Sequence, residues 1–272
     1  PPAAGRRLHG VEGGEQCIEA DQRHGRRCYA DIGVRCCDGG TVRLTYDERT
    51  EAFRAELRQW LDENLPDRAA TTEPPTSSAG PPAWARELQR TMFDAGWLVP
   101  GYPPELGGRN ATLFEQMVYL QELADRNVTR TFNPQGVGIV AASIVSYGDD
   151  SQRRGYAMPI LRAEMTAAVG MSEPNAGSDL ASLSTRAVLD GDHFVVNGQK
   201  VWTSGAHDAD VLLVFVRTDP DAPKHRGISA LLIETDRPGL TRRPFADITG
   251  VDHRDFNDVF FDDVVVPREN LV

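Results

Sequence analysis

The sequence contains no apolar run approaching the roughly 20 residues that span a bilayer, and its N-terminus has no apolar stretch of the signal-peptide kind. No serine lies in a G-x-S-x-G motif, which argues against a hydrolase of that type. Gly136-Val137-Gly138 lacks the third glycine and the preceding strand of a dinucleotide fingerprint, so we interpret it as helix packing. These absences predict a cytoplasmic protein with no membrane partner.

Cysteine is absent from residues 42–272. All four cysteines lie in the first 41 residues: Cys17, Cys28, Cys36 and Cys37. Their spacing has no C-x-x-C pair, and the histidines have no ligand-like intervals, so we predict no metal site. The same 41 residues are rich in Gly and Arg and show no helical or strand period. We expect residues 1–41 to be a disordered or non-native extension, one hypothesis being that translation begins at Val42.

The charge is acidic and unevenly distributed. Residues 1–41 carry six arginines against six acidic residues, so the net charge of −11 belongs to residues 42–272. An acidic body argues against nucleic acid as a partner. With 40% hydrophobic and 25% charged residues over 272 positions, the composition is that of a soluble globular protein with room for two domains.

Residues 42–165 carry helical patterns and predict an all-α N-terminal domain. A capping box, Thr45-x-x-Glu48, precedes a helix that Pro66 ends. Its apolar stripe consists of Phe53, Leu57, Trp60 and Leu61. The Pro- and Ser-rich stretch that follows, up to Pro82, predicts a surface loop.

Further helical segments complete this domain. One runs through Trp84, Leu88 and Met92, and a second capping box, Thr112-x-x-Glu115, begins another. In that helix we expect Leu113, Met117 and Leu120 to face inward. Residues 135–147 and 150–163 fit two more helices.

Residues 166–272 change to short β-rich runs. The expected strands are 166–171, 184–189, 193–197, 211–217, 228–234 and 257–266. Asp190-Gly191 is a strong hairpin signal between two of them. The fold class is therefore α+β, with a helical N-terminal domain followed by an antiparallel β-barrel middle domain.

Two polar segments of the β-rich region stand out. Gly170-Met171-Ser172-Glu173-Pro174-Asn175-Ala176-Gly177-Ser178-Asp179 leaves a strand, and Val201-Trp202-Thr203-Ser204-Gly205 follows a hairpin. Hydroxyls, free amides and an indole suit a flat, polar-edged ring such as a flavin. Taken singly, the first segment is equally typical of a plain turn, and a strand tryptophan is more often core. Their pairing favours one shared pocket.

Several motifs together resemble the acyl-CoA dehydrogenase family. They are Met-Ser-Glu-Pro-Asn-Ala-Gly-Ser-Asp, Asn-Gly-Gln-Lys-Val-Trp-Thr-Ser-Gly, Gly-Ile-Ser-Ala-Leu-Leu-Ile and Phe-Asn-Asp-Val-Phe-Phe-Asp-Asp-Val-Val-Val-Pro, in family order and spacing. The similarity extends back through Gly96-Trp97, Pro104-Glu105-Leu106-Gly107-Gly108 and Tyr147-Gly148. It covers roughly residues 44–272 and implies a helical N-terminal domain, a β-barrel middle domain and bound FAD.

The resemblance also implies roles for single residues. Met171 and Ser172 would meet the pyrimidine edge of the flavin, Ser204 would approach its N5 edge, and Trp202 would lie against the ring. Ser178 would line the cofactor and touch the pantetheine arm of the substrate. The full cofactor-binding set implied is Val169, Met171, Ser172, Gly177, Ser178, Trp202, Thr203 and Ser204.

The implied reaction is the α,β-dehydrogenation of an acyl-CoA thioester in fatty acid β-oxidation, with an electron-transfer flavoprotein as electron acceptor. A carboxylate takes the α proton, the β hydrogen leaves as hydride, and hydrogen bonds stabilise the developing enolate. The full-length family member would form a dimer or tetramer.

The resemblance ends where the catalytic base would lie. The sequence stops at Val272, where the family's C-terminal helical domain begins, and that domain supplies the catalytic glutamate. We therefore expect no catalytic residue in this chain and interpret it as a fragment that is inactive alone, with Glu173 serving the loop framework. Two alternatives stay open: a non-catalytic or split subunit paired with a partner chain, and a flavin oxidase or monooxygenase of the same fold.

Overall fold

The computed structural model describes residues 34–35, 41–42, 46–67, 71–246 and 254–272. It divides into two units, Pro1–Tyr46 and Asp47–Val272. In the first unit, β1 (Val34–Arg35) pairs antiparallel with β2 (Thr41–Val42). The remainder of residues 1–41, with all four cysteines, lies outside the described residues, so the hypothesis of a disordered or non-native extension stays a prediction.

The second unit begins with helix α1 (Glu48–Asn64). Its N-cap is Asp47, whose carboxylate accepts a hydrogen bond from the Thr50 amide at 2.8 Å, so the predicted cap at Thr45 is wrong. Asp is as good an N-cap residue as Thr. Asp47 directly precedes Glu48, the first residue of the helix, so its carboxylate rather than the Thr45 hydroxyl caps the first turn. Phe53, Leu57 and Leu61 are buried as predicted.

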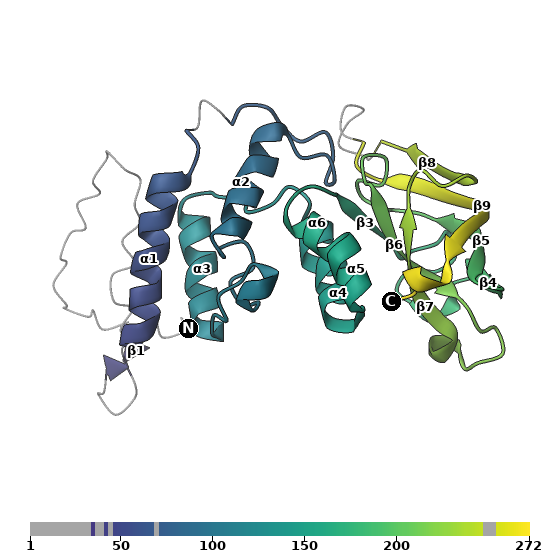
Figure 1. The fold of residues 1–272 in the computed structure, drawn as a ribbon, viewed down its shortest axis with the longest axis horizontal. Helices are drawn as coiled ribbons and strands as arrows, with labels where there is room; N and C mark the ends of the chain where they lie inside the picture. Colours follow the sequence, from purple (N-terminus) through teal and green to yellow (C-terminus); the bar gives the residue numbers. More distant parts are fainter. Residues whose placement is uncertain (1–33, 36–40, 43–45, 68–70, 247–253) are drawn as a thin grey trace, which may run out of the picture. The chain divides into compact units, whose positions relative to one another are not determined.

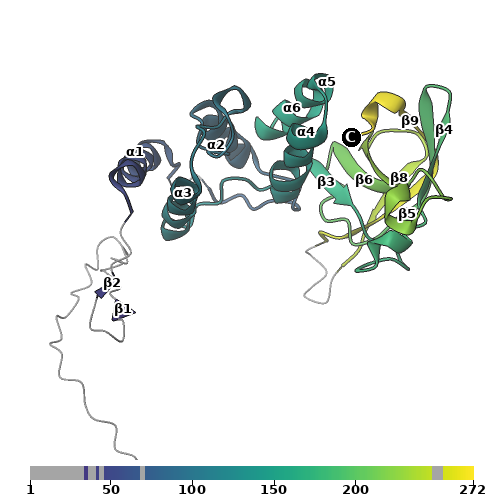
Figure 2. The same cartoon turned by 90° about the horizontal axis from the view of Figure 1, so that it is seen from below.

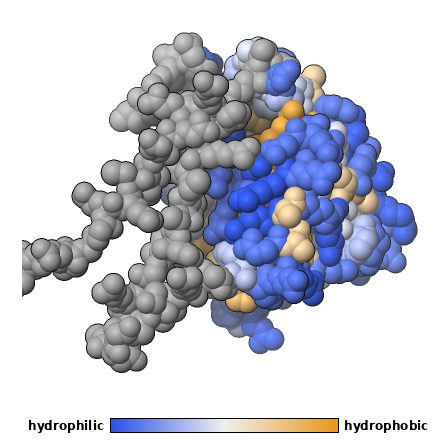
Figure 3. All heavy atoms as spheres, turned by 90° about the vertical axis from the view of Figure 1, so that its left-hand side faces the viewer, coloured by the Kyte–Doolittle hydropathy of each residue, from blue (hydrophilic) through white to orange (hydrophobic). Residues whose placement is uncertain are grey.

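The side on which α1 lies in Figure 1 faces the viewer in Figure 3, and the surface coloured there is mostly hydrophilic.

Helices α2 (Ala83–Asp94) and α3 (Leu113–Asp125) follow, with the short 3-10 turn η2 (Pro104–Leu106) between them. The capping box that begins α3 is confirmed, because the Thr112 hydroxyl accepts from the Glu115 amide and the Glu115 carboxylate accepts from the Thr112 amide. The face predicted to be inward is wrong. Leu113 is 78% exposed, and Met117 and Leu120 also face solvent.

Instead, α3 turns two glutamates inward. Glu115 and Glu122 are buried together with Val118, Tyr119 and Leu123. Arg49 of α1 pairs with Glu115 at 3.0 Å, and Arg58 of α1 pairs with Glu122 at 2.8 Å. The arginines of α1 thus compensate the buried carboxylates, and these charges, rather than the apolar stripe, orient the helix.

The last helical elements agree with the two predicted segments. The π-helical turn η3 (Gly136–Val140) continues into α4 (Ala141–Tyr147). The second segment consists of α5 (Asp150–Gln152), the π-helical turn η4 (Arg153–Ala157) and α6 (Met158–Leu161). The described part of 65–82 has no helix or strand, as predicted, but Ser77 and Ala79 are buried, so it is not simply a surface loop.

From residue 166 onward the chain forms one curled sheet of seven strands, next to the helices in Figure 1 and seen as an open curl in Figure 2. The strands are β3 (Ala167–Gly170), β4 (Arg186–Asp190), β5 (His193–Lys200), β6 (Val211–Arg217), β7 (Ile228–Glu234), β8 (Leu240–Pro244) and β9 (Asn257–Pro267). Six of them were predicted. β8 was missed, because its sequence Leu-Thr-Arg-Arg-Pro shows no apolar alternation.

The helical N-terminal region and the barrel-like sheet confirm the fold class, with one correction. The sheet is mixed rather than antiparallel. β3 pairs parallel with β6, and β4 touches β6 in parallel at Arg186 and Arg217, whereas β4–β5, β5–β9, β6–β7 and β8–β9 are antiparallel. The β4–β5 hairpin separates β3 from β6 in sequence, and a connection of that length allows parallel pairing.

Candidate functional site

The two polar segments meet in the structure. The first leaves the end of β3, and the second leaves the end of β5. The Val201 amide donates to the Ser172 carbonyl at 2.9 Å. This bond joins Met171–Ser178 (the Ser172 loop) to Val201–Gly205 (the Trp202 loop), as their pairing in the sequence predicted.

A buried ion pair between Lys200 and Glu173 stabilises the junction of the two loops. The fully buried Lys200 ammonium donates to the Glu173 carboxylate at 2.8 Å and to the Met171 carbonyl at 3.2 Å. Glu173 also accepts from the Ser184 amide and hydroxyl and from the Thr185 amide. Burial acts against its charge, yet the hydrogen bonds, that from Lys200 foremost, lower the pKa of Glu173 to about 2. Burial in turn lowers the pKa of Lys200.

This arrangement places Glu173 in the loop framework, where the sequence had predicted it. All of its strong donors lie within the protein, so its carboxylate has no open side for proton transfer. Lys200 was not singled out from the sequence. Its signal was the isolated lysine in an arginine-rich chain, at an inward position of a strand.

Strand β3 lies at the edge of the sheet, and amide side chains satisfy its outer edge. Asn133 accepts from the Ala167 amide at 2.9 Å, and Gln135 accepts from the Val169 amide at 3.0 Å. Amides of a strand point to the same edge at every second residue, so the next one in this row belongs to Met171. Within the described residues no side chain or loop carbonyl accepts from it. Val169 itself is buried.

Trp202 is an exposed aromatic residue beside two phenylalanines. The residue is 59% exposed, and its ring packs edge-on against Phe245 and Phe256 at centroid distances of 5.0 and 5.5 Å. The expectation that Trp202 continues the strand is wrong. β5 ends at Lys200, and the backbone of Trp202 has a φ of +60°, a left-handed conformation that ends ladder pairing. Turned out of the ladder, the Trp202 ring contacts the two phenylalanines and stays more than half exposed.

The residues after Trp202 combine tight anchoring with free hydroxyls. Thr203 and Asn257 exchange backbone hydrogen bonds of 3.2 and 3.1 Å. The Thr203 hydroxyl is buried and has no hydrogen-bond partner in the part of the chain that the structure describes. Ser204 is half-buried, and no hydrogen bond of its hydroxyl is found within the same residues.

Gly177 and Ser178 lie on the exposed side of the Ser172 loop. A Cβ built on Gly177 would meet no atom within 4 Å, so the space above it is open. The structure thus brings Met171 and Ser172 together with the segment Trp202–Ser204. It buries Val169 and the Thr203 side chain and leaves Gly177 and Ser178 at the exposed rim. The Met171 amide, the Ser204 hydroxyl and the exposed Trp202 ring thus belong to one surface region of the chain.

Comparison with protein families assigns the chain. Residues 47–164 match the acyl-CoA dehydrogenase N-terminal domain, and residues 168–264 match the acyl-CoA dehydrogenase middle domain. The chain belongs to the acyl-CoA dehydrogenase family. The predicted family is confirmed for these two domains.

Curated members of the acyl-CoA dehydrogenase family are similar over most of the chain. Acyl-CoA dehydrogenase FadE29 of Mycobacterium tuberculosis is 38% identical over 231 residues, which are 85% of this chain and 57% of FadE29. Acyl-CoA dehydrogenase IpdE1 of the same organism is 37% identical, over 82% of this chain and 58% of its own length. The chain therefore spans less than three fifths of these relatives.

Solved structures of acyl-CoA dehydrogenases share the fold. The Tcur3481-Tcur3483 steroid ACAD is 35% identical with a TM-score of 0.69, covering 84% of this chain and 58% of that one. The ChsE4-ChsE5 complex from Mycobacterium tuberculosis is 36% identical with a TM-score of 0.67, covering 85% and 57%. A glutaryl-CoA dehydrogenase from Mycobacterium smegmatis, solved in complex with FADH2, is 23% identical with a TM-score of 0.60 and shows the shared fold.

In the described residues, no helix is both long and apolar enough to cross a membrane.

Proposed function

We propose that this chain forms the N-terminal and middle parts of an FAD-dependent acyl-CoA dehydrogenase and that the Ser172 and Trp202 loops hold the flavin. The observation that carries the proposal is their junction. One hydrogen bond, from Val201 to Ser172, brings an outward amide, two hydroxyl-bearing loops and an exposed indole together in a protein of this family. A place in acyl-CoA β-oxidation in the cytoplasm is part of the same proposal.

The donor set fits a flavin. The ring is flat, has carbonyl and nitrogen acceptors along its edges and presents two apolar faces. The outward Met171 amide and the Ser204 hydroxyl can donate to such edges, and the exposed Trp202 side chain can cover the ring. The buried Thr203 hydroxyl supports the fit, since a buried hydroxyl without a partner costs about 1–3 kcal/mol unless something pairs with it.

Each residue of the site then has a task. Met171 and Ser172 would orient the pyrimidine edge of the flavin, Ser204 would donate near its N5 edge, and Trp202 would exclude water from the ring. Ser178, at the exposed rim beside the open space over Gly177, contacts the pantetheine arm of the acyl-CoA. FAD held at this site would supply the hydride acceptor for the β hydrogen of the thioester, and an electron-transfer flavoprotein would be the electron acceptor. The carboxylate that removes the α proton is not Glu173, whose oxygens are already bonded within the loops.

FAD titration tests the proposal. We expect the chain to quench flavin fluorescence on binding, weakly because the chain spans only part of its relatives, and we expect Trp202→Ala and Ser204→Ala to weaken binding. Ser229→Ala is the matched control, because the Ser229 hydroxyl bonds to Thr218 at 2.6 Å instead of standing free on the Trp202 loop. Absence of binding, or equal affinities for the Ser204 and Ser229 variants, would contradict the proposed site. Fast reaction of the reduced flavin with oxygen would instead indicate an oxidase or monooxygenase.

A second candidate is a split enzyme in which a partner chain supplies the remaining helical domain. The observation that favours it is the apolar stripe of α3, formed by Leu113, Met117 and Leu120, all of which are at least half exposed. A stripe of this kind on a helix is typical of a buried packing face. Among the relatives, the ChsE4-ChsE5 complex is named for two components.

We propose that the occupant of this stripe is the helical part of an acyl-CoA dehydrogenase, carried by the same polypeptide or by a partner. Mixing the chain with the part of FadE29 that the match does not span, followed by sedimentation, tests it. We expect a complex that gains acyl-CoA dehydrogenase activity, assayed with straight-chain and steroid acyl-CoA thioesters because one solved relative is a steroid ACAD. Leu120→Asp should abolish the complex, whereas Leu189→Asp should not, since Leu189 of β4 is also exposed, at 47% against 61% for Leu120. Equal loss for both variants would argue against the stripe.

A further inference from the structure

A loop of the helical region enters the sheet region beside the Trp202 loop. This segment, Thr76–Gly80, is called the strap below. Ala79 of the strap is completely buried and belongs to the same hydrophobic core as Ala206 and Ala209. The strap therefore continues the core of the sheet rather than lying on its surface.

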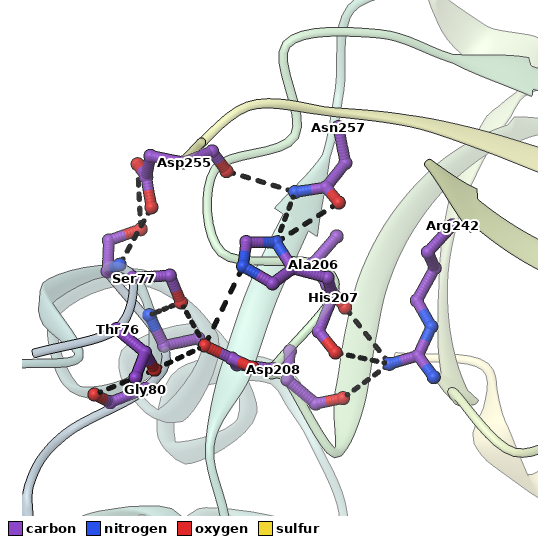
Figure 4. A network of polar contacts seen from close by, with 12 residues as sticks. Thr76, Ser77, Gly80, Ala206, His207, Asp208, Arg242, Asp255 and Asn257 are labelled. Carbon is purple, nitrogen blue, oxygen red and sulfur yellow. Dashed lines mark hydrogen bonds and ion pairs between the residues drawn. The ribbon is translucent and has the colours of Figure 1, made fainter. Parts of the chain in front are cut away.

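Two aspartates of the sheet region bind the strap (Figure 4). The Asp208 carboxylate accepts from the hydroxyls of Thr76 at 2.6 Å and Ser77 at 2.9 Å. The Asp255 carboxylate accepts from the Ser78 amide at 2.7 Å and from the Ser78 hydroxyl at 3.1 Å. Bonds to charged acceptors are the stronger kind, so the strap is held at three consecutive residues.

Asp255 also holds the Trp202 loop. Its main-chain carbonyl accepts from the Gly205 amide at 2.7 Å and from the Asn257 side-chain amide at 2.9 Å. The same Asn257 amide donates to the Thr203 carbonyl at 3.0 Å. The carboxylate of one residue thus binds the strap, while its carbonyl binds the loop on the C-terminal side of Ser204.

The strap and the loop are also in direct contact. Gly205 has a φ of +69°, and a Cβ at that position would lie 2.6 Å from the Ala79 amide nitrogen and 3.0 Å from the Ser78 hydroxyl. The distance to the Ala79 backbone nitrogen is shorter than real Cβ atoms essentially ever show, so any side chain at position 205 would have to displace the strap. Ser204 therefore lies between two fixed neighbours. Thr203 is hydrogen-bonded to Asn257, and Gly205 is hydrogen-bonded to Asp255 and packs against the strap.

We infer that Asp255 is a positioning residue: by binding Ser78 of the strap, it sets the conformation of the Trp202 loop and so the place of the Ser204 hydroxyl. The consequence of this inference, a change in FAD affinity, rests on the proposed function. Its structural part, the ordering of the Trp202 loop by the strap, does not need the flavin.

Amide hydrogen exchange on the full chain without FAD tests the structural part. Asp255→Ala should accelerate exchange of the Gly205 and Thr203 amides at least about tenfold, because the carbonyl of residue 255 loses its anchor. Asp255→Asn should restore much of the protection, because its amide oxygen still accepts from Ser78. Asp258→Ala is the matched control, since Asp258 also lies on this stretch but accepts from Gln199 instead.

FAD affinity tests the consequence. We expect Asp255→Ala to weaken FAD binding at least about tenfold, with Asp255→Asn in between and Asp258→Ala unchanged. Ser78→Ala, which removes only the hydroxyl contact, gives a milder change in the same direction and replaces Asp255→Ala if that variant does not fold. Exchange and affinity within twofold of Asp258→Ala would overturn the inference. Failure of the wild-type chain to bind FAD would overturn the proposed function, and amide exchange would still decide whether Asp255 orders the loop.

Discussion

Replacing Lys200 by methionine should destabilise the chain by about 3 kcal/mol at pH 7, because it leaves Glu173 charged, buried and without its cation. The depressed pKa of Glu173, to which the Ser184 and Thr185 donors also contribute, gives a figure of the same order. The pKa of Glu173 falls from an ordinary 4.5 to about 2. Since a tenfold change in proton binding corresponds to about 1.4 kcal/mol, that depression represents roughly 3 kcal/mol of stability for the charged form in the native protein.

The pH dependence identifies the cause. A carboxyl group whose pKa is lowered on folding stabilises the native state above its unfolded pKa of about 4.5, and the contribution is lost as the pH falls toward 2. In Lys200→Met the Glu173 pKa moves up, because the hydrogen bond from Lys200 is the largest of those that lower it, so most of this acid loss disappears. The difference in unfolding free energy between wild type and variant should therefore shrink by about two thirds between pH 7 and pH 3.

Urea denaturation at several pH values, followed by circular dichroism, measures this difference. The double variant Glu173→Gln, Lys200→Met should be more stable than Lys200→Met alone, because a neutral amide replaces the unpaired buried charge. A loss below about 1 kcal/mol at pH 7, or a loss that does not change with pH, would refute the reasoning.

Two further changes test the packing of the chain. Glu122→Ala should cost about 2 kcal/mol at pH 7, because it removes the buried carboxylate that pairs with Arg58 and Arg126 and whose pKa these arginines lower against the effect of burial. The cost should fall with acidification below about pH 4.5, and urea denaturation with exposed Glu63→Ala as control measures it. Gly205→Ala should cost at least about 1 kcal/mol more than Gly191→Ala in thermal unfolding, since both glycines have a positive φ but only Gly205 is in close contact. Equal costs would contradict the packing of the strap on Gly205.

The sheet could largely be predicted because its strands have strong local signals. β6 and β7, with their apolar runs of Val, Leu and Ile, appear at the predicted residues. The parallel pairing of β3 with β6 could not be predicted, since it depends on contacts between residues more than 40 positions apart, such as Ala167 and Val211. Local periodicity carries no information on which strands become neighbours.

The orientation of α3 shows a different limit. An apolar stripe predicts a buried face only where nothing stronger competes. Here Glu115 and Glu122 meet arginines more than 60 residues away in sequence, and that long-range charge pairing turns Leu120 to the surface. An arginine every four or five residues on α1, at Arg49, Arg54 and Arg58, was the signal in the sequence.

The meeting of the two loops was predictable from the sequence, but their supports were not. The polar motifs named Ser172 and Trp202, and the structure brings their loops together. Lys200 and Asp255 act from outside the motifs, and the strap comes from a stretch whose prolines and serines predict only a loop. Such supports become visible only when distant segments are placed in space.

The structure of the chain with FAD bound tests the central claim most directly. We predict the isoalloxazine ring against the exposed Trp202 side chain, with its edges within hydrogen-bond distance of the Met171 amide and the Ser204 hydroxyl. A flavin bound elsewhere on the chain, or one that leaves both of these donors unpaired, would contradict the proposed site.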